Sequence, residues 1–591
     1  MEQDVQVLKG GEFLIKETDY RTNFIPEDLN EDQQLIRQSV REFVETEVWK
    51  KGHLLEHQVE LMDKAASIGL LGAHIPEAYG GSPLDTHSNT LISEELGRGD
   101  GSFSTSLAAH TGIGMLPILY FGSEYLKNKY LPGLCSGQLK AAYCLTEPGS
   151  GSDALSAKTQ AVLSADGTNF ILNGQKMWIS NAGFADIFIV FAQIDGTKFT
   201  GFVVEKGSKG LHLGEEEHKL GIKGSSTRQV FFENVSVPKE NILGEIGKGH
   251  LIAFNVLNIG RFKLGAMTMG GCKRCIATSI NYANDRIQFG HPISFFGAIQ
   301  YKIAESAIRT FAVESTVYRV SDLMEDKKNA SLTEGRDYAQ AMLESAEEYA
   351  VECAIIKIFG SEVIDYVVDE MLQIHGGYGF SEEYPPARAF RDARINRIYE
   401  GTNEINRMLI INMIIRRAMK GELDLVGPAW EVQKELTGLP KMELPEGKYG
   451  NELRSVKDFK KLALMVSGAA VKYQMDGKHE LKDQQEILMN VSDILMDLYN
   501  AESVLLRVQK LNDRQHPNLE IYEAIMKVFF WDAQTRLVKN AQDALASFAL
   551  GDELKIMMIG IKRFARYEAI NVKEMRRKIA KKLIEENAYA L

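Results

Sequence analysis

The strongest constraint on the fold is a double change in the spacing of apolar residues along the 591-residue chain. From about residue 27 to 140 apolar positions recur every three to four residues, as in Gln33–Glu47, which predicts an N-terminal helical domain. Between residues 141 and 245 the apolar runs become short, β-branched and aromatic, without intervening helical spacing. We therefore predict a central β domain, an antiparallel barrel or sandwich, in which Asn173-Gly174 forms the turn of a hairpin.

The remainder of the chain is predicted to be helical, so the fold is expected to be mainly α with a central β domain. Long periodic stretches over residues 246–420 favour a C-terminal helical bundle. Residues 421–450 hold three prolines and five glycines, a composition typical of a linker. Residues 451–591 are again periodic and are predicted to form an additional helical domain.

Two helical segments of the chain resemble each other. Glu314–Val320 reads ESTVYRV, and Glu502–Val508 reads ESVLLRV. The similarity indicates that the last domain is a decayed copy of the preceding bundle, with a chance match of seven positions as the alternative.

Composition and charge exclude several classes of protein. The 68 basic and 80 acidic side chains give a net charge of −12, which argues against a nucleic-acid-binding protein. Cys272 and Cys275 form a CxxC pair with no second pair or histidine partners, so neither a disulfide framework nor a metal site is predicted. The start of the chain has no secretory-signal pattern, and the uncharged stretch Gly101–Ser123 favours buried helix and turn over a membrane span. A cytoplasmic location is expected.

Two segments of the β domain have residues suited to binding a flat ligand. In Tyr143–Asp153 two glycines allow the backbone to approach a ligand closely, and several hydroxyls can donate hydrogen bonds. On the strand that follows Asn173-Gly174, Trp178 lies next to Ser180, as an aromatic plate beside a donor would. Taken singly, the first segment could be an ordinary polar loop. The second could be an ordinary strand with Trp178 in the core and Ser180 on the surface.

A third segment, Arg397–Arg407, contains a candidate general base. Gly401 directly after Glu400 permits a sharp turn that presents the carboxylate to a cleft. Partial desolvation beside Tyr399 would raise the pKa of the carboxyl toward that of a useful base. The alternative is that Glu400 is a solvated residue capping a helix.

Six motifs in this order resemble the acyl-CoA dehydrogenase family of flavoenzymes over residues 30–415. They are YCLTEPGSGSD, NGQKMWISN, KLGIKGSSTRQVFFENVSVP, RIQFG, QIHGGYGF with RDARI, and IYEGTNEI. The family has helical, β and helical domains in this order and uses FAD as its cofactor. The resemblance implies that Glu400 removes the α-proton of an acyl thioester while the β-hydride passes to the flavin. It also implies that the thioester carbonyl binds the backbone N–H of the base and a ribityl hydroxyl of the flavin.

The resemblance also assigns contacts to individual residues. Flavin contacts are implied for Tyr143, Leu145, Thr146, Ser152, Trp178, Ile179, Ser180, Thr402 and Glu404. Contacts with the FAD of a neighbouring subunit, and hence at least a homodimer, are implied for Arg286, Phe289, Gln373, Gly376 and Gly377. Substrate contacts are implied for Ser152, Asn258, Arg261, Tyr399 and Gly401.

Two features resemble the very-long-chain branch of the family. A minority of the family has its base directly before the position of Arg261; here that residue is Gly260, which leaves Glu400 as the base and leaves room in the pocket. The additional domain after residue 420 is also typical of that branch. A long-chain acyl-CoA is therefore the expected substrate.

The additional domain raises the question of membrane contact. Residues 562–582 hold nine Lys or Arg and two Glu, and Val572, Met575, Ile579 and Leu583 share one helical face. Such a helix can lie on an anionic membrane surface, as can the segment around Trp430; the alternative is a bundle helix with a solvated basic face. Peripheral association with the inner face of the membrane is thus one hypothesis.

The expected function is the first step of fatty-acid β-oxidation, with trans-2-enoyl-CoA as product and an electron-transfer flavoprotein as electron acceptor. An acyl-CoA oxidase using dioxygen is one alternative. A respiratory-complex assembly factor with secondary catalysis is another.

Overall fold

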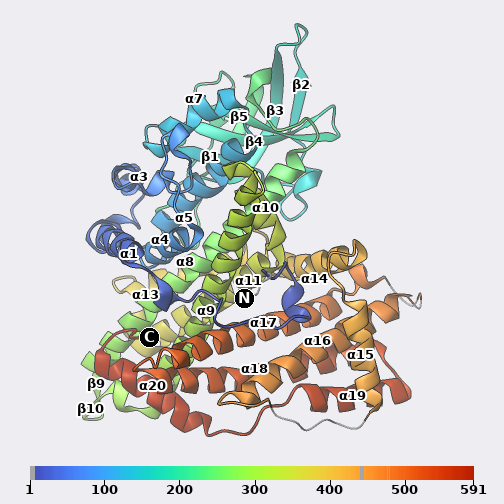
Figure 1. Ribbon diagram of the computed structural model, residues 1–591. Helices are drawn as coiled ribbons and strands as arrows, with labels where there is room; N and C mark the ends of the chain where they lie inside the picture. The colour runs from blue at the N-terminus through green and yellow to red at the C-terminus, as the bar shows by residue number, and fades with distance from the viewer. Residues whose placement is uncertain (1–6, 439–444, 476, 478–479) are drawn as a thin grey trace.

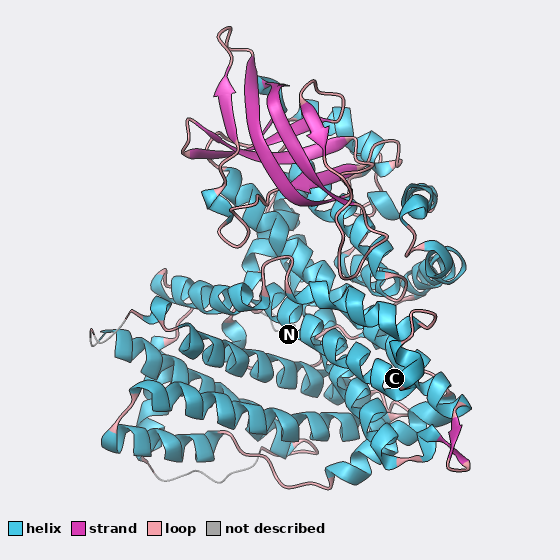
Figure 2. Cartoon of the chain, turned by 180° about the vertical axis from the view of Figure 1, so that it is seen from behind, coloured by secondary structure: helices cyan, strands magenta, loops and turns pink. Residues whose placement is uncertain are grey.

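The computed structural model describes residues 7–438, 445–475, 477 and 480–591. Helices form most of the chain, and a single large sheet lies at one end of the molecule, as Figures 1 and 2 show. The predicted fold class, mainly α with a central β domain and an additional C-terminal helical domain, is confirmed.

The N-terminal region folds into short helices with polar caps at their first turns. Asn30 accepts a hydrogen bond from the Gln33 N–H at 2.9 Å, and the Gln33 side chain accepts one from the Asn30 N–H, which closes a capping box. The Asp85 and Asp100 side chains cap two later helices by accepting hydrogen bonds from the Ser88 and Ser102 N–H groups. The helices are α1 Glu31–Phe43, α2 Trp49–Lys51, α3 Gln58–Ser67, α4 Thr86–Gly97, α5 Gly101–Ala108, α6 Leu116–Phe121 and α7 Glu124–Cys135.

The uncharged stretch Gly101–Ser123 is folded within this region. It comprises α5, a π-helical turn Ala109–Gly114 and α6, and most of its residues are buried. No helix in the described ranges is both long and apolar enough to cross a membrane.

The β domain is a curved mixed sheet instead of an antiparallel barrel or sandwich. Its strands are β1 Ala141–Cys144, β2 Gln160–Leu163, β3 Asn169–Ser180, β4 Ile187–Ile194, β5 Lys198–Glu205, β6 Leu211–Leu213, β7 Thr227–Pro238 and β8 Ile242–Leu243. They follow the open order β6-β7-β3-β2-β4-β5-β8, with β1 beside β4. Both β1 and β2 run parallel to β4, a pairing between distant segments that the spacing of apolar residues does not reveal.

The sheet buries both of its faces. Every residue of β4 is buried. Ile187, Ile189 and Phe191 share a core with the helices, whereas Phe188, Val190 and Ala192 share a second core with other strands. In that second core Phe170 of β3 meets Phe202 of β5, with ring centroids 5.6 Å apart, because the sheet curls over it.

The predicted turn at Asn173-Gly174 is wrong. Both residues lie inside β3, at a β-bulge against β7, and the connection from β2 to β3 turns instead at Gly167. The Asn173 side chain accepts a hydrogen bond from the Asn234 N–H at 2.8 Å, and a Cβ on Gly174 would lie 2.5 Å from Thr159 Oγ1. Asn173 is therefore explained by the hydrogen bond of its side chain, and Gly174 by the close approach of the Thr159 side chain.

Long helices connect the sheet to the other end of the molecule (Figure 1). They are α8 Gly249–Asp285, α9 Gly297–Thr333, α10 Tyr338–Glu348, α11 Ala350–His375, α12 Gly377–Phe380, α13 Pro385–Ala393 and α14 Asn403–Met419. A two-stranded hairpin, β9 Ile287–Gln288 and β10 His291–Pro292, separates α8 from α9. The close packing of α8 on α11 makes these two helices the frame for the residues described below.

The last helices lie across the end of the molecule opposite the sheet, as Figures 1 and 2 show. They are α16 Gly450–Met475, α17 Gln485–Asp513, α18 Leu519–Phe548, α19 Gly551–Phe564 and α20 Val572–Glu586. Residues 421–450, the predicted linker, contain a further helix, α15 Val426–Thr437, which packs on α16. Residues 439–444 of that segment lie outside the described residues.

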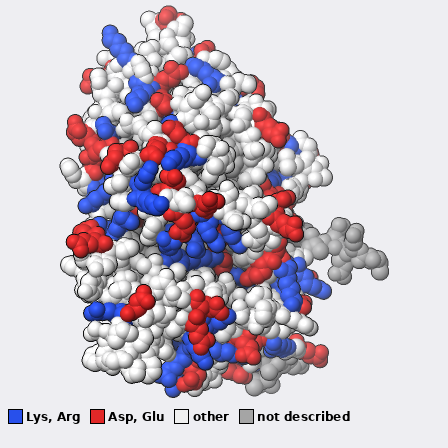
Figure 3. Space-filling model, turned by 90° about the vertical axis from the view of Figure 1, so that its left-hand side faces the viewer, with Lys and Arg blue, Asp and Glu red and all other residues white. Residues whose placement is uncertain are grey.

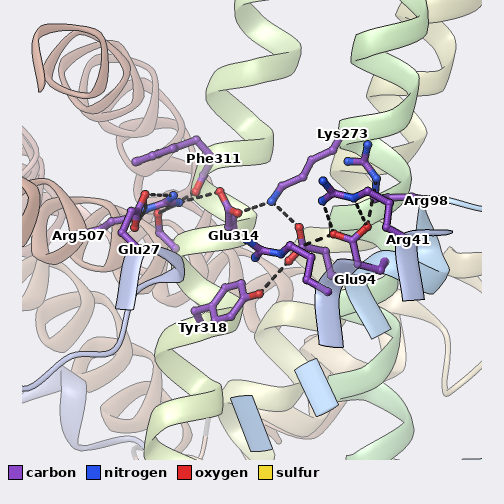
Figure 4. A network of polar contacts seen from close by, with 12 residues as sticks. Glu27, Arg41, Glu94, Arg98, Lys273, Phe311, Glu314, Tyr318 and Arg507 are labelled. Carbon is purple, nitrogen blue, oxygen red and sulfur yellow. Dashed lines mark hydrogen bonds and ion pairs between the residues drawn. The ribbon is translucent and has the colours of Figure 1, made fainter. Parts of the chain in front are cut away.

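The two similar segments face each other in α9 and α17. Arg319 donates to Glu502 at 2.8 Å and to Ser503 at 3.1 Å, while Arg507 donates to Glu314 at 2.8 Å. Both arginines are almost fully buried. The network continues from Glu314 through Lys273 of α8 to Glu94 of α4 (Figure 4). Equivalent residues thus make reciprocal contacts, which favours duplication over a chance match.

The basic C-terminal segment packs on the body of the protein. Residues 562–582 are divided between the end of α19 and most of α20. Ile579 and Leu583 of α20 are buried, and Arg576 pairs with Glu305 of α9 at 2.6 Å and with Asp532 of α18 at 2.9 Å. The apolar face proposed for membrane contact is therefore occupied by neighbouring helices.

Charges of both signs are interspersed on the molecular surface. On the face drawn in Figure 3, a group of Lys and Arg side chains near the centre is bordered by Asp and Glu side chains. This face therefore has no field of a single sign.

Candidate active site

Glu400 lies in a sharp turn immediately before α14. Its φ is +57° and that of Gly401 is +80°, so two consecutive residues have left-handed conformations. The Asn406 side chain of α14 donates to the Gly401 carbonyl at 2.7 Å, and the Arg261 guanidinium donates to the Glu400 carbonyl at 3.3 Å. Strained backbone held from two helices is typical of a functional residue.

The carboxylate of Glu400 is shielded from solvent. Its Oε2 atom is inaccessible and has no hydrogen-bond partner among the described residues. Burial raises the pKa of Glu400 to about 7, and the nearby cations of Arg261 and Lys357 oppose this rise. The backbone N–H of Glu400 likewise has no acceptor in the described part of the chain. A carboxyl with this pKa can accept a proton at neutral pH, and the free N–H can bind a carbonyl oxygen.

Lys357 of α11 supports the turn, a role that the motifs did not reveal. Its ammonium group donates to the Gly401 carbonyl and to Asn403 Oδ1, each at 2.7 Å. Burial lowers the pKa of Lys357 to about 7, while the neighbouring Glu400 raises it. A lysine inside the apolar run AIIKIF was the available sequence signal.

Gly260 of α8 lies directly against the carboxylate. A Cβ at this position would be 2.6 Å from Glu400 Oε2. Any side chain at position 260 would therefore displace the carboxylate.

Several residues predicted to contact substrate surround the turn. Asn258 and Arg261 are buried and bind each other at 2.7 Å, with Arg261 also holding the turn of Glu400. The Tyr399 hydroxyl donates to Asn396 at 2.6 Å. Ser152 is exposed on the loop after β1, away from these contacts. The structure thus gives Arg261 a supporting role that does not require a ligand.

A channel begins at Glu400 and runs along one face of α8. The α8 residues in its wall share one face of the helix: Gly260, Lys263, Leu264, Met267, Thr268, Gly271, Arg274, Cys275 and Thr278. The opposite wall includes only small residues from α5 and the π-helical turn, apart from Ile113: Gly101, Ser104, Thr105, Ala108, Ala109 and Gly112. At the far end the Arg274 guanidinium lies 4.0 Å from the ring centroid of Trp49.

The length of this channel follows from helix geometry. Gly260 and Thr278 are 18 positions apart in α8, which corresponds to about 27 Å at ~1.5 Å per residue. An extended alkyl chain rises about 1.25 Å per carbon, so the wall spans on the order of 20 carbons. The small side chains of α5 and the π-helical turn provide the space for such a chain.

The predicted flavin contacts of the β domain include one residue in the wall of the channel and several outside it. Ser180 lines the channel together with Glu400 and Tyr399. Trp178 has a φ of +60° and is 54% exposed, an unusual state for a tryptophan within a strand. Tyr143 is buried with an unpaired hydroxyl, and its pKa is raised by burial and by the nearby Glu400. A half-exposed aromatic ring and a buried, unpaired hydroxyl in the same sheet fit a flat, polar-edged cofactor.

The loop that contains Leu145, Thr146 and Ser152 is fixed by an ion pair that the motifs did not reveal. Lys176 and Glu147 bind at 2.7 Å inside the sheet, and Lys176 also donates to the Leu145 carbonyl. Glu147 accepts from the N–H groups of Lys158 and Thr159. The Thr146 carbonyl accepts from the Met177 N–H at 2.9 Å, which joins the loop to the strand carrying Trp178 and Ile179.

The remaining predicted flavin contacts occupy two other places. Thr402 caps α14 through its side chain, and Glu404 lies in the first turn of that helix. Arg286, Gly376 and Gly377 line a second hollow with Tyr282 and Tyr378, and Gln373 is exposed one turn before it. Phe289, at the tip of the β9–β10 hairpin, is 90% exposed. Glu400 does not line this hollow. Within one subunit, the residues around Glu400 and the residues of the second hollow therefore do not share a cavity.

Comparison with known families covers most of the chain. Models of the acyl-CoA dehydrogenase N-terminal, middle and C-terminal domains match residues 30–138, 142–235 and 247–415. A further acyl-CoA dehydrogenase C-terminal domain model matches residues 458–563. The chain is 46% identical over 595 residues to a probable acyl-CoA dehydrogenase of Bacillus subtilis, with coverage of 100% of this chain and 99% of that protein.

More distant relatives and solved structures agree. The human mitochondrial very long-chain specific acyl-CoA dehydrogenase is 35% identical over 571 residues, covering 90% of this chain and 82% of that protein. A Bacillus anthracis acyl-CoA dehydrogenase solved in complex with FAD superposes with a TM-score of 0.95 at 45% identity, covering 99% and 100% of the two chains. Butyryl-CoA dehydrogenase of Megasphaera elsdenii superposes with a TM-score of 0.59 at 36% identity, covering 66% of this chain and 99% of that one. Together with the shielded carboxylate at the mouth of a long channel, these matches show that the chain belongs to the acyl-CoA dehydrogenase family.

Proposed function

We propose that the protein is an FAD-dependent dehydrogenase that converts long-chain acyl-CoA to trans-2-enoyl-CoA in fatty-acid β-oxidation. Glu400 takes the α-proton, and its backbone N–H holds the thioester carbonyl while negative charge develops on the oxygen. When bound, FAD accepts the hydride that leaves the β-carbon, so that the Cα–Cβ single bond becomes a double bond. An electron-transfer flavoprotein is the proposed acceptor of the electrons.

The length and composition of the channel support the proposed preference for long acyl chains. Its α8 wall is about 27 Å long, and glycine occupies the wall at positions 97, 101, 112, 260 and 271. A Cβ at position 271 would meet Ile364 of the same wall at 3.2 Å, so a larger residue there would narrow the channel. Trp49 and Arg274 line the far end, where the last carbons of the chain would lie.

The proposed FAD site uses residues whose conformation or exposure otherwise has no explanation. The half-exposed Trp178 would lie against the flavin, with Ser180 at its edge between flavin and substrate. Thr146 and Leu145 would contact the ring system from the loop that the Glu147–Lys176 pair fixes. The N-terminus of α14, with Thr402 as its cap, provides backbone N–H groups suited to a phosphate.

The second hollow supports a homodimer. Arg286, Gly376 and Gly377 line it, and the β9–β10 hairpin with its exposed Phe289 lies beside it through Gln288. In the proposed dimer these residues and Gln373 contact the FAD of the neighbouring subunit. The cytoplasm is the proposed location.

The test is an anaerobic titration of the purified flavoprotein with saturated acyl-CoA thioesters from butyryl to lignoceryl, monitored by the visible flavin absorbance. We expect rapid bleaching, fastest for chains of about 14–20 carbons, which the channel accommodates. Glu400→Gln should bind acyl-CoA but reduce its flavin at least ~10²–10⁴-fold more slowly. A protein that is bleached best by butyryl-CoA would overturn the proposed chain length, and normal reduction by the Gln variant would overturn the proposed base.

A further inference from the structure

Lys263 of α8 is buried in the wall of the channel without a counter-charge. The residue is 7% exposed, and its one hydrogen bond among the described residues is a long contact of 3.5 Å to Thr111 Oγ1. No described carboxylate forms an ion pair with it, in contrast to the buried Lys273 and Lys460. Buried lysines are rare unless they are paired, so an unpaired one calls for a partner from outside the chain.

The position of Lys263 shows where that partner would lie. Lys263 lines the channel and also a small cavity behind the channel wall, with Ser104, Ala108 and Met267 shared by both. His74 lines the small cavity, and its buried Nδ1 atom has no hydrogen-bond partner within the described chain. A Cβ on Gly112 would lie 3.9 Å from Lys263 Nζ, so the glycine leaves the amine open on that side.

A saturated acyl chain would leave this polar group unsatisfied. Burial lowers the pKa of Lys263 to about 7, so the amine is partly uncharged at neutral pH and can both donate and accept a hydrogen bond. The occupant of the channel can supply an oxygen partner, because Lys263 lines the channel. The channel continues past Lys263 to Thr278, so that oxygen would lie within the chain and not at its end.

The helix also indicates which carbons pass this point. Gly260 lies against the Glu400 carboxylate, which acts on the α-carbon, and Lys263 and Met267 follow three and seven positions later. At ~1.5 Å per residue these positions are about 4.5 and 10.5 Å along the axis. With about 1.25 Å per carbon, this range corresponds to roughly the sixth to tenth carbon of the acyl chain.

We propose that Lys263 forms the centre of a polar subsite for a hydroxyl group on the middle of a long acyl chain, near the sixth to tenth carbon. The proposal rests on the function proposed above and extends it from saturated to mid-chain hydroxylated acyl-CoA thioesters. Thr111, and His74 across the small cavity, supply further polar groups on that side of the wall.

The experiment compares kcat/KM of the holoenzyme for palmitoyl-CoA and for its isomers hydroxylated at the fourth, eighth or fifteenth carbon. We expect the eighth-carbon isomer to be used at least as well as palmitoyl-CoA and about tenfold better than the other two isomers. Lys263→Met should abolish this positional preference and raise kcat/KM for palmitoyl-CoA, because a methionine presents no polar group to the chain. Leu550→Met, at an exposed position between α18 and α19 outside the channel, should leave the ratios between substrates as they are in the wild type.

Equal use of the three isomers by the wild-type enzyme would overturn the subsite, even if Lys263→Met failed to fold. A positional preference that persists in Lys263→Met would also overturn the role of the lysine. Failure of the enzyme to oxidise palmitoyl-CoA and every isomer, with the flavin bound, would instead refute the function on which the proposal rests.

Discussion

Replacing Gly260 with alanine tests whether the position of the Glu400 carboxylate governs catalysis. The added Cβ would lie 2.6 Å from Oε2, 2.8 Å from Cδ and 3.1 Å from Oε1, whereas ordinary van der Waals contact begins at 3.4 Å. The carboxylate must therefore retreat by about 0.8 Å, and a misplacement near ~1 Å costs on the order of 10²-fold in rate. This loss corresponds to about 2.7 kcal/mol of transition-state stabilisation.

The substitution should not disturb the fold. Gly260 lies inside α8, where alanine is favoured over glycine by ~1 kcal/mol. The assay is the rate of flavin reduction by saturating acyl-CoA in an anaerobic stopped-flow experiment, with flavin content and unfolding temperature as checks on integrity. We expect a reduction rate about 10²-fold below that of the wild type, with bound flavin and thermal stability retained.

Gly271→Ala is the matched control. Gly271 lies on the same face of α8, 11 positions further along, or about 16 Å from Gly260. Its Cβ would meet the flexible end of Ile364 at 3.2 Å, so it narrows the channel without touching the base. This variant should weaken binding of the longest acyl chains and leave the reduction rate for shorter ones near normal. A Gly260→Ala enzyme that reduces its flavin as fast as Gly271→Ala would refute the link between carboxylate position and rate.

Three further predictions concern the base, its support and the helical end of the molecule. Because Glu400 must be ionised to accept a proton and burial raises its pKa to about 7, kcat/KM should rise with pH through about 7 and level off above it; a profile that is flat from pH 5.5 to 8.5 would contradict this assignment. Lys357→Met removes two hydrogen bonds beneath the turn and a cation that lowers the pKa of Glu400, so the reduction rate should fall roughly 10-fold or more and the pH profile should shift upward. A lower rate with an unshifted profile would limit Lys357 to a structural role. Glu502→Gln leaves the buried Arg319 and Lys460 without their counter-charge and should cost about 3–5 kcal/mol, whereas Asp552→Asn, at an exposed pair, should leave the unfolding temperature unchanged. Equal unfolding temperatures for the two variants would contradict the importance of the α9–α17 contact.

Local patterns in the sequence were sufficient to predict the order of helical and β segments. The spacing of apolar residues is a property of neighbouring residues. The predicted change from helix to strand near residue 141 and the return to helix near residue 246 therefore both appear in the structure. The Glu400-Gly401 turn could be predicted for the same reason, since glycine permits a left-handed conformation at its own position in the chain. Asn173-Gly174 shows the limit of such arguments, because the same two residues serve a turn or a bulge depending on the neighbouring strand.

The tertiary structure decided which distant residues meet. Gly260 and Glu400 are 140 positions apart, yet the packing of α8 beside the turn places one against the other. Lys357 and Lys263 acquire their properties from burial, which depends on the helices around them and not on their neighbours in sequence. The reciprocal pairs of α9 and α17, the parallel strands beside β4 and the buried face of α20 are also long-range contacts. The sequence by itself determined most local elements and the turn at Glu400, because these depend on adjacent residues. The channel and its charges required the fold, because they arise between segments that only packing brings together.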